Sequence, residues 1–120
     1  MENNIILDKS KAFAVRIIKF YQYLWDEKKE FVLSKQLLRS GTSIGANARE
    51  SKNAQSKADF IHKLSISLKE ADETAYWIEL LIESGIVQEN QVHDLHESNI
   101  ELIKILTSII RTSKKGGKIN

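Results

Sequence analysis

The 120-residue chain contains no cysteine and no proline. Without cysteine, the chain has no disulfide, no thiolate metal ligand and no thiol nucleophile. Without proline, it lacks the residue that most often breaks helices and fills linkers. No apolar run approaches the length of a membrane span, and the N-terminal MENNIILDKSK lacks a basic region followed by a hydrophobic signal segment. We therefore expect a cytoplasmic protein with no membrane partner.

Apolar residues recur at steps of three and four along four stretches, a spacing that places them on one face of a helix. The first predicted helix begins at Asp8 or Ser10, both of which suit an N-cap, and ends near Lys29. The second spans about residues 33–53 and the third opens within residues 55–59. The third ends at Ser84, and the fourth spans about residues 90–111.

The third and fourth helices carry the most regular stripes. Ser56 followed by Asp59 is typical of a capping box, and Gly85 suits the left-handed position after a helix end. The predicted core stripe of the third helix comprises Ile61, Leu64, Leu68, Ala71, Ala75, Ile78 and Ile82. That of the fourth comprises Val92, Leu95, Asn99, Leu102, Leu106 and Ile109, with one polar member.

Four helices joined by short connections, with no β-rich run, predict an all-α, antiparallel, up-down-up-down four-helix bundle. We expect residues 1–111 to form this single domain. The remaining residues, 112–120, include KKGGKIN and have no apolar periodicity. They are predicted to form a basic, disordered tail.

The stretch RSGTSIGANARES, residues 39–51, is rich in small residues. A phosphate-binding loop would need GxxxxGK[ST] after a strand, and neither that pattern nor GxGxxG is present. The alternative is a helix with a small face. Glycine inside a helix costs about 1 kcal/mol relative to alanine, so Gly41 and Gly45 predict close approach by a neighbour. Trp25 and Trp77 are the candidates to fill this groove; a kink at Gly45 is the other interpretation.

Two segments carry a family resemblance: LLRSGTSIGANARES (residues 37–51) and SKADFIHKLSISLKEADETAYWIELL (residues 56–81). The sequence resembles the four-helix-bundle family encoded in intervening sequences of bacterial 23S rRNA genes, often labelled ribosomal-protein-like. It is also similar to the accessory variability protein of diversity-generating retroelements. The approximate family pattern R-x-x-x-S-I-x-A-N-x-x-E is met by Arg39, Ser43, Ile44, Ala46, Asn47 and Glu50. The chain departs from it at Gly45, where many members have proline.

The resemblance implies a homo-oligomer, specifically a homopentameric ring or barrel, and a role in binding structured RNA or a ribonucleoprotein. It implies no enzymatic activity, and we expect no cofactor. For the motif residues Ser43, Ile44, Ala46, Asn47 and Glu50 we expect a structural role, with Asn47 bonding across helices near Ser43 or Thr42. The competing hypothesis is a protein adaptor or structural oligomer with no nucleic-acid binding.

Charge is unevenly distributed along the chain. Residues 32–58 have a net charge of +4 and residues 59–85 a net charge of −4. The candidate nucleic-acid-binding residues are Lys35, Arg39, Arg49, Lys52 and Lys57. Such cations bind phosphates without reading sequence. In the alternative, they form a solvated face, and Arg39 pairs with Glu50 or with an acidic residue of the third helix.

Ile66, Trp77 and Leu80 lie off the predicted core stripe of the third helix. A contiguous apolar patch outside the core indicates a partner surface, so these residues are the candidate oligomer interface. In the alternative, Trp77 folds over the small face of the second helix within one subunit.

The three histidines give little support for a metal site or a catalytic site. His93 and His96 are three residues apart, but the chain contains no Glu-x-x-His, the pattern of bundle di-metal sites. No histidine and carboxylate are spaced to activate a serine or threonine. We therefore expect neither a metal site nor catalytic residues.

Overall fold

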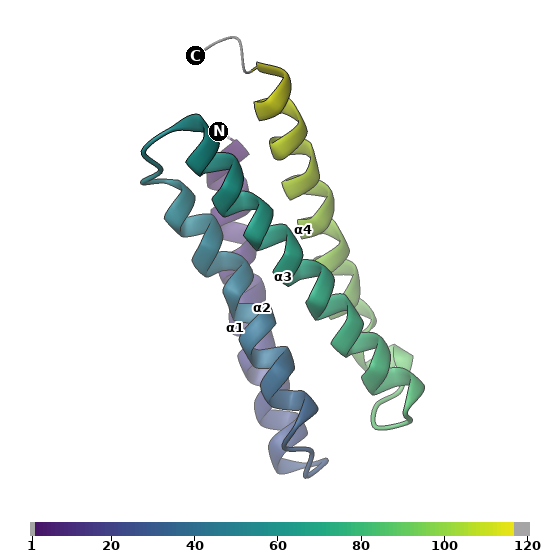
Figure 1. Cartoon of the computed structure of the whole chain (residues 1–120). Helices are drawn as coiled ribbons and strands as arrows, with labels where there is room; N and C mark the ends of the chain where they lie inside the picture. The colour runs from purple at the N-terminus through teal and green to yellow at the C-terminus, as the bar shows by residue number, and fades with distance from the viewer. Residues whose placement is uncertain (1, 117–120) are drawn as a thin grey trace.

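The computed structural model describes residues 2–116 and consists of four helices. These are α1 (Glu2–Asp26), α2 (Leu33–Ser51), α3 (Lys57–Glu83) and α4 (Glu89–Lys115). They run up and down in turn as an elongated antiparallel bundle of 51 × 21 × 20 Å (Figure 1). Each helix packs on the next, and α1 packs on α4. The predicted all-α four-helix bundle is confirmed.

The two ends of α3 follow the predicted signals. The Ser56 hydroxyl accepts a hydrogen bond of 3.0 Å from the backbone N–H of Asp59, as expected of an N-cap. After the helix, Gly85 adopts a left-handed conformation with φ +83°. The N–H groups of Ile86 and Val87 then donate to the carbonyl of Leu81, at 3.1 and 3.2 Å. The chain therefore turns tightly into α4.

The predicted start of α1 is wrong. The helix begins at Glu2, so Asp8 and Ser10 lie inside it and cap nothing. The Ser10 hydroxyl donates to the carbonyl of Leu7 within the same helix, and the side chain is buried against α2. A serine that bonds its own helix and packs under a neighbour resembles a cap residue in sequence, which explains the error.

Glu30 caps the next helix from outside it. Its carboxylate accepts the backbone N–H groups of Val32, Leu33 and Ser34, at 3.2, 3.0 and 2.6 Å. These are among the N–H groups that the first turn of a helix leaves without partners. The charged run 26–30 therefore contains a residue that fixes the start of α2.

The core face of α3 is rotated from the predicted stripe. Its buried residues are Leu64, Ser67, Ala71, Thr74, Ile78 and Leu81, whereas Ile61, Leu68, Ala75 and Ile82 are only partly buried. The two polar members bond to α2: Ser67 donates to the carbonyl of Ile44 at 2.7 Å, and Thr74 to the hydroxyl of Ser40 at 2.9 Å. Small hydroxyl side chains thus occupy the α2–α3 interface.

The core stripe of α4 is as predicted, and all six of its residues are buried. Asn99, fully buried, donates from Nδ2 to the carbonyl of Ala71 at 2.9 Å. Its Oδ1 atom is buried with no hydrogen-bond partner in residues 5–116. An unpaired buried acceptor costs roughly 1–3 kcal/mol, so Asn99 is a weak point of the core.

We expect Asn99→Leu to change the free energy of unfolding by no more than about 1 kcal/mol, because removing the unpaired buried acceptor offsets the cost of a side chain with the same branching but greater bulk. Urea denaturation followed by circular dichroism measures this difference. Asn99→Asp is the matched control, since it keeps the shape and adds a buried charge. A large loss of stability in Asn99→Leu would contradict the assignment of Oδ1 as unpaired.

The predicted disordered tail is wrong for residues 112–115. α4 continues through Lys115, four residues beyond the predicted end at Arg111. Lysines in the last turn of a helix interact favourably with the exposed carbonyls there, and Lys114 and Lys115 occupy that turn. Residues 117–120 lie outside the described part of the chain.

Candidate nucleic-acid interface

The two glycines of α2 allow α1 to approach closely. A Cβ atom on Gly41 would lie 2.8–3.0 Å from three side-chain atoms of Ile17. One on Gly45 would lie 3.2 Å from the hydroxyl oxygen of Ser10. The prediction of close approach is therefore confirmed, but Trp25 and Trp77 do not fill the space. α2 also runs through Gly45 without a break.

Next to this contact, α1 and α2 form an open groove with a volume of about 530 Å³. Its apolar and small lining residues are Leu7, Ala14, Gly45 and Ala46. Its charged and polar lining consists of Asp8, Lys11, Thr42, Arg49 and Lys52. The groove thus combines three cations and one carboxylate with small and apolar residues.

Two of the five predicted nucleic-acid-binding residues, Arg49 and Lys52, meet in this groove. Lys11, which α1 contributes to the groove, was not among the predicted residues. Leu7, Lys11 and Ala14 are spaced as neighbours on one helix side, but only the pairing of α1 with α2 reveals where that side points. Within residues 5–116, none of the three cations has an ion-pair partner.

The other three predicted residues lie elsewhere. Arg39 forms ion pairs with Glu70, at 3.2 Å, and with Glu73, so its alternative interpretation as a partner of the third helix holds. The Lys35 ammonium lies 5.6 Å from the centre of the Trp25 ring. The Nζ atom of Lys57 is buried and has no partner in the described residues. The structure therefore does not join the five cations into one strip.

The family-like motif residues make contacts within α2 or to α3. Ser43 donates to the carbonyl of Arg39 at 2.6 Å, and Asn47 donates to the carbonyl of Ser43 at 2.9 Å. The expected bond from Asn47 across helices is therefore wrong. Ile44 is fully buried and Ala46 lines the groove.

Glu50 binds the first half of α3. Its carboxylate accepts a hydrogen bond of 3.0 Å from the ammonium of Lys63. That hydrogen bond, together with the negative charge of Glu50, raises the pKa of Lys63 above its ordinary value. Lys63 is therefore occupied by an intramolecular partner and does not add to the cations of the groove.

The three predicted interface residues on α3, Ile66, Trp77 and Leu80, are all half-buried. The Trp77 indole donates to the Glu73 carboxylate at 3.0 Å and packs at the edge of the core. Tyr76, which was not among the predicted residues, is 53% exposed, and the centre of its ring lies 5.2 Å from that of Trp77. Tyr76 thus extends the apolar surface beyond the predicted residues.

No set of three or more metal-ligating side chains comes together among the described residues. The same part of the chain has no helix long and apolar enough to span a membrane. His93 lies beside Glu89, Asn90 and Asp94 at the start of α4, in an open depression.

Comparison with known proteins places this arrangement in a family. The family model described as 23S rRNA-intervening sequence protein matches residues 2–108. A crystal structure of a protein of unknown function from the S23 ribosomal protein family of Bacteroides thetaiotaomicron is 55% identical, with a TM-score of 0.90. That likeness covers 92% of this chain and 99% of the other. None of the curated proteins matches. The chain therefore belongs to the 23S rRNA-intervening sequence protein family.

Proposed function

We propose that this protein is a non-enzymatic, self-associating helical bundle of the cytoplasm that binds the phosphate backbone of structured RNA, free or in a ribonucleoprotein. The supporting observation is the α1–α2 groove, where Lys11, Arg49 and Lys52 have no ion-pair partner among residues 5–116. Cations that are not neutralised within the molecule are available to phosphates.

The chemistry of the groove favours the backbone of RNA over its bases. Lysine and arginine side chains displace counterions from phosphates, and this term is independent of sequence. Among the described residues that line the groove, none is an aromatic side chain on which a base would stack, which is how single-stranded RNA is usually read. Self-association would repeat the groove on one particle and raise its affinity through multivalency.

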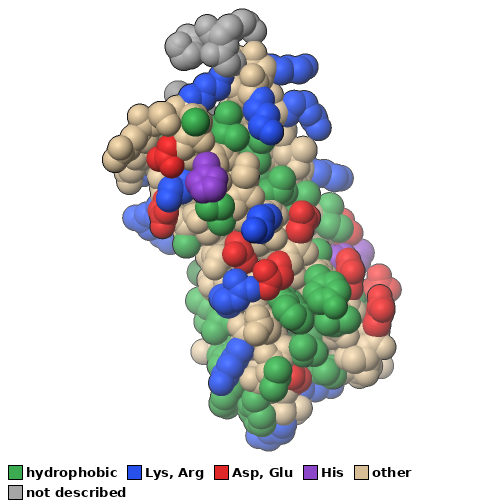
Figure 2. Space-filling view, viewed as in Figure 1, with side chains coloured by type: hydrophobic (Ala, Val, Ile, Leu, Met, Phe, Trp, Pro, Cys, Tyr) green, Lys and Arg blue, Asp and Glu red, His purple; other side chains and the backbone are tan. Residues whose placement is uncertain are grey.

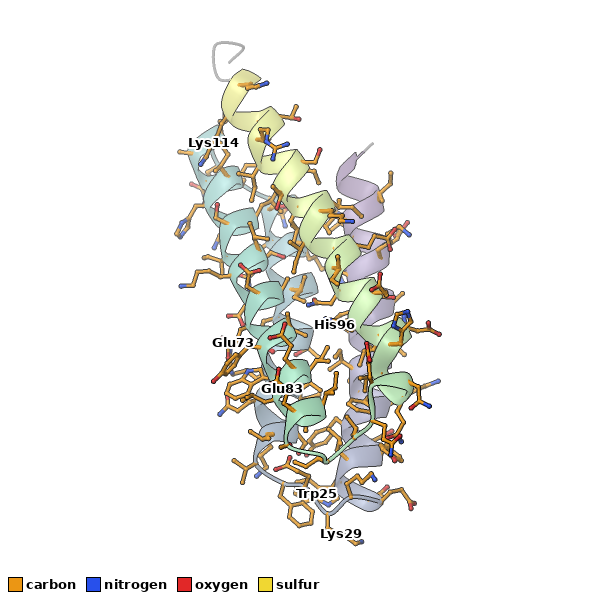
Figure 3. All side chains as sticks on the ribbon, turned by 90° about the vertical axis from the view of Figure 1, so that its right-hand side faces the viewer. Trp25, Lys29, Glu73, Glu83, His96 and Lys114 are labelled. Atoms are coloured by element: carbon orange, nitrogen blue, oxygen red, sulfur yellow. The ribbon has the colours of Figure 1, made fainter. Side chains whose placement is uncertain are left out.

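We expect Arg49→Glu combined with Lys52→Glu to abolish most of the binding of a structured hairpin RNA. A plot of the logarithm of the binding constant against the logarithm of salt concentration has a negative slope. The magnitude of this slope should decrease by about 2, because two phosphate contacts are lost. The measurement is fluorescence anisotropy of labelled RNA at several salt concentrations. Lys28→Glu combined with Lys29→Glu is the matched control, since it makes the same charge change at the opposite end of the bundle, where Figure 3 labels Lys29.

If the two double variants lost the same RNA affinity, the loss would be explained by net charge alone. That result would contradict the proposal that RNA binds in the groove. A wild-type protein that binds no RNA at low salt would support the second candidate, a protein adaptor or structural oligomer. That candidate is favoured by the apolar side chains exposed near the α1–α2 turn, among them Trp25, Phe31 and Val32. Its binding to a protein partner would be insensitive to salt.

A further inference from the structure

Asp8 places a carboxylate in the α1–α2 groove, beside the cations Lys11, Arg49 and Lys52. The groove lies toward the end of the bundle where α1 begins and α2 ends (Figure 1). Lysine and arginine side chains are prominent at this upper end on the face shown in Figure 2. A carboxylate in this position repels phosphates unless it makes a favourable contact of its own with the same ligand.

The fold itself makes no use of the Asp8 side chain. Asp8 lies inside α1, caps no helix and is exposed. Its carboxylate has neither an ion pair nor a hydrogen bond with any residue in the described part of the chain. Other carboxylates nearby have partners: Glu50 pairs with Lys63 at 3.0 Å, and Glu101 pairs at 3.2 Å with Lys9, the neighbour of Asp8. The Asp8 carboxylate is therefore available to a ligand.

Asp8 stands between cations along the groove. α1 and α2 are antiparallel, and Gly45 meets α1 at Ser10. Arg49, one turn after Gly45, is therefore level with the turn before Ser10, which contains Asp8. Lys11 follows Asp8 by three residues, or about 4.5 Å along the helix axis. One cation thus stands across the groove from the carboxylate, and another lies about one turn away on the same helix.

The groove combines these cations with hydrogen-bond acceptors. An ionised carboxylate such as that of Asp8 accepts hydrogen bonds and donates none. Thr42, which also lines the groove, donates its hydroxyl to the carbonyl of Leu38 at 2.8 Å, so its lone pairs remain for a ligand. The cations suit phosphates, whereas the acceptors require a ligand that donates. In the backbone of RNA, that donor is the ribose 2′-hydroxyl, which DNA lacks.

We propose that Asp8 determines the specificity of the groove: its carboxylate accepts a hydrogen bond from a ribose 2′-hydroxyl, while the three cations bind adjoining phosphates. This inference rests on the proposed function and adds to it the discrimination of RNA from DNA. A charged acceptor forms a stronger hydrogen bond than a neutral one, and it repels phosphates when no donor reaches it. The same carboxylate therefore favours a backbone that carries 2′-hydroxyls and disfavours one that does not.

The test compares three hairpins of one sequence: RNA, 2′-fluoro RNA, which has the same charge but no 2′-hydroxyl donor, and DNA. Fluorescence anisotropy at one salt concentration measures their Kd values. We expect the wild type to bind RNA roughly tenfold more tightly than either other hairpin. Asp8→Ala should remove this preference, because it deletes both the acceptor and the repulsion. Asp26→Ala is the matched control that should keep it, since it removes the same charge from an exposed site at the other end of α1.

Asp8→Ala should fold, because alanine favours a helix and Asp8 has no partner to lose; circular dichroism verifies this. Equal binding of RNA and 2′-fluoro RNA by the wild type, or a preference that survives Asp8→Ala, would overturn the role of Asp8 and leave the RNA proposal standing. Stronger binding of all three hairpins by the same factor in Asp8→Ala would reduce Asp8 to a repelling surface charge, which also overturns the inference. A wild type that binds none of the hairpins would contradict the proposed function itself.

Discussion

Ile44→Asp is expected to unfold the bundle. Ile44 is fully buried between α2 and its neighbours, and its carbonyl also accepts the hydroxyl of Ser67. Truncating a buried isoleucine costs about 2–5 kcal/mol, and an aspartate there would add an unpaired buried charge or force its own protonation. The sum approaches the whole stability of a typical domain, about 5–15 kcal/mol. Circular dichroism should show loss of most of the helical signal at neutral pH.

Ala46→Asp is the matched control for this change. Ala46 is exposed, lies two residues away on the same helix and lines the groove beside Arg49 and Lys52. The same added charge should therefore leave the urea midpoint nearly unchanged, since surface substitutions usually act within about 0.5 kcal/mol. A folded, fully helical Ile44→Asp protein would contradict the placement of Ile44 in the core.

The second large effect is expected at Gly41. Alanine favours a helix over glycine by about 1 kcal/mol, so local propensity predicts that Gly41→Ala stabilises α2. The new methyl group, however, would lie 2.8–3.0 Å from the Ile17 side chain, which is fully buried and β-branched. Such a side chain has little rotamer freedom in a helix, and overpacking costs about 1–3 kcal/mol. Setting the propensity gain against the overpacking cost, we expect a net loss of up to about 2 kcal/mol.

A double-mutant cycle separates the two contributions. In the background of Ile17→Ala the clash is absent, so adding Gly41→Ala should raise the urea midpoint through helix propensity. Gly41→Ala is thus expected to lower stability when isoleucine is at position 17 and to raise it when alanine is there. A higher midpoint for Gly41→Ala in the wild-type background would show that α1 gives way easily, contrary to the tight contact described above.

The parts of the fold that depend on local sequence were predictable. Ser56 and Gly85 fix the ends of α3 through contacts within a few residues, and the stripe of α4 is apolar except for Asn99. The predicted core stripe of α3 differs from the buried face because a pattern of apolar residues leaves out Ser67 and Thr74. These hydroxyls are buried because each has a bonding partner on α2, which periodicity does not reveal.

The candidate site was only partly predictable for a related reason. Arg49 and Lys52 were recognised from local charge, but charge alone did not separate them from Arg39, which two carboxylates of α3 neutralise. Lys11 joins the groove only because α1 packs against the small face of α2. The closeness of that packing was expected from the glycines, whereas the identity of the partners, Ile17 and Ser10, depends on the register between two helices.

The two tryptophans of the chain provide optical probes at two different places on the bundle. Trp25 lies near the end of α1 under the Lys35 ammonium group, whereas Trp77 lies on α3 and donates to the Glu73 carboxylate. Opposite charges beside an indole shift its fluorescence emission in different ways. Replacing either tryptophan with phenylalanine would leave a single emitter, whose spectrum would then report, without any label, whether the surface around it is covered or exposed to water.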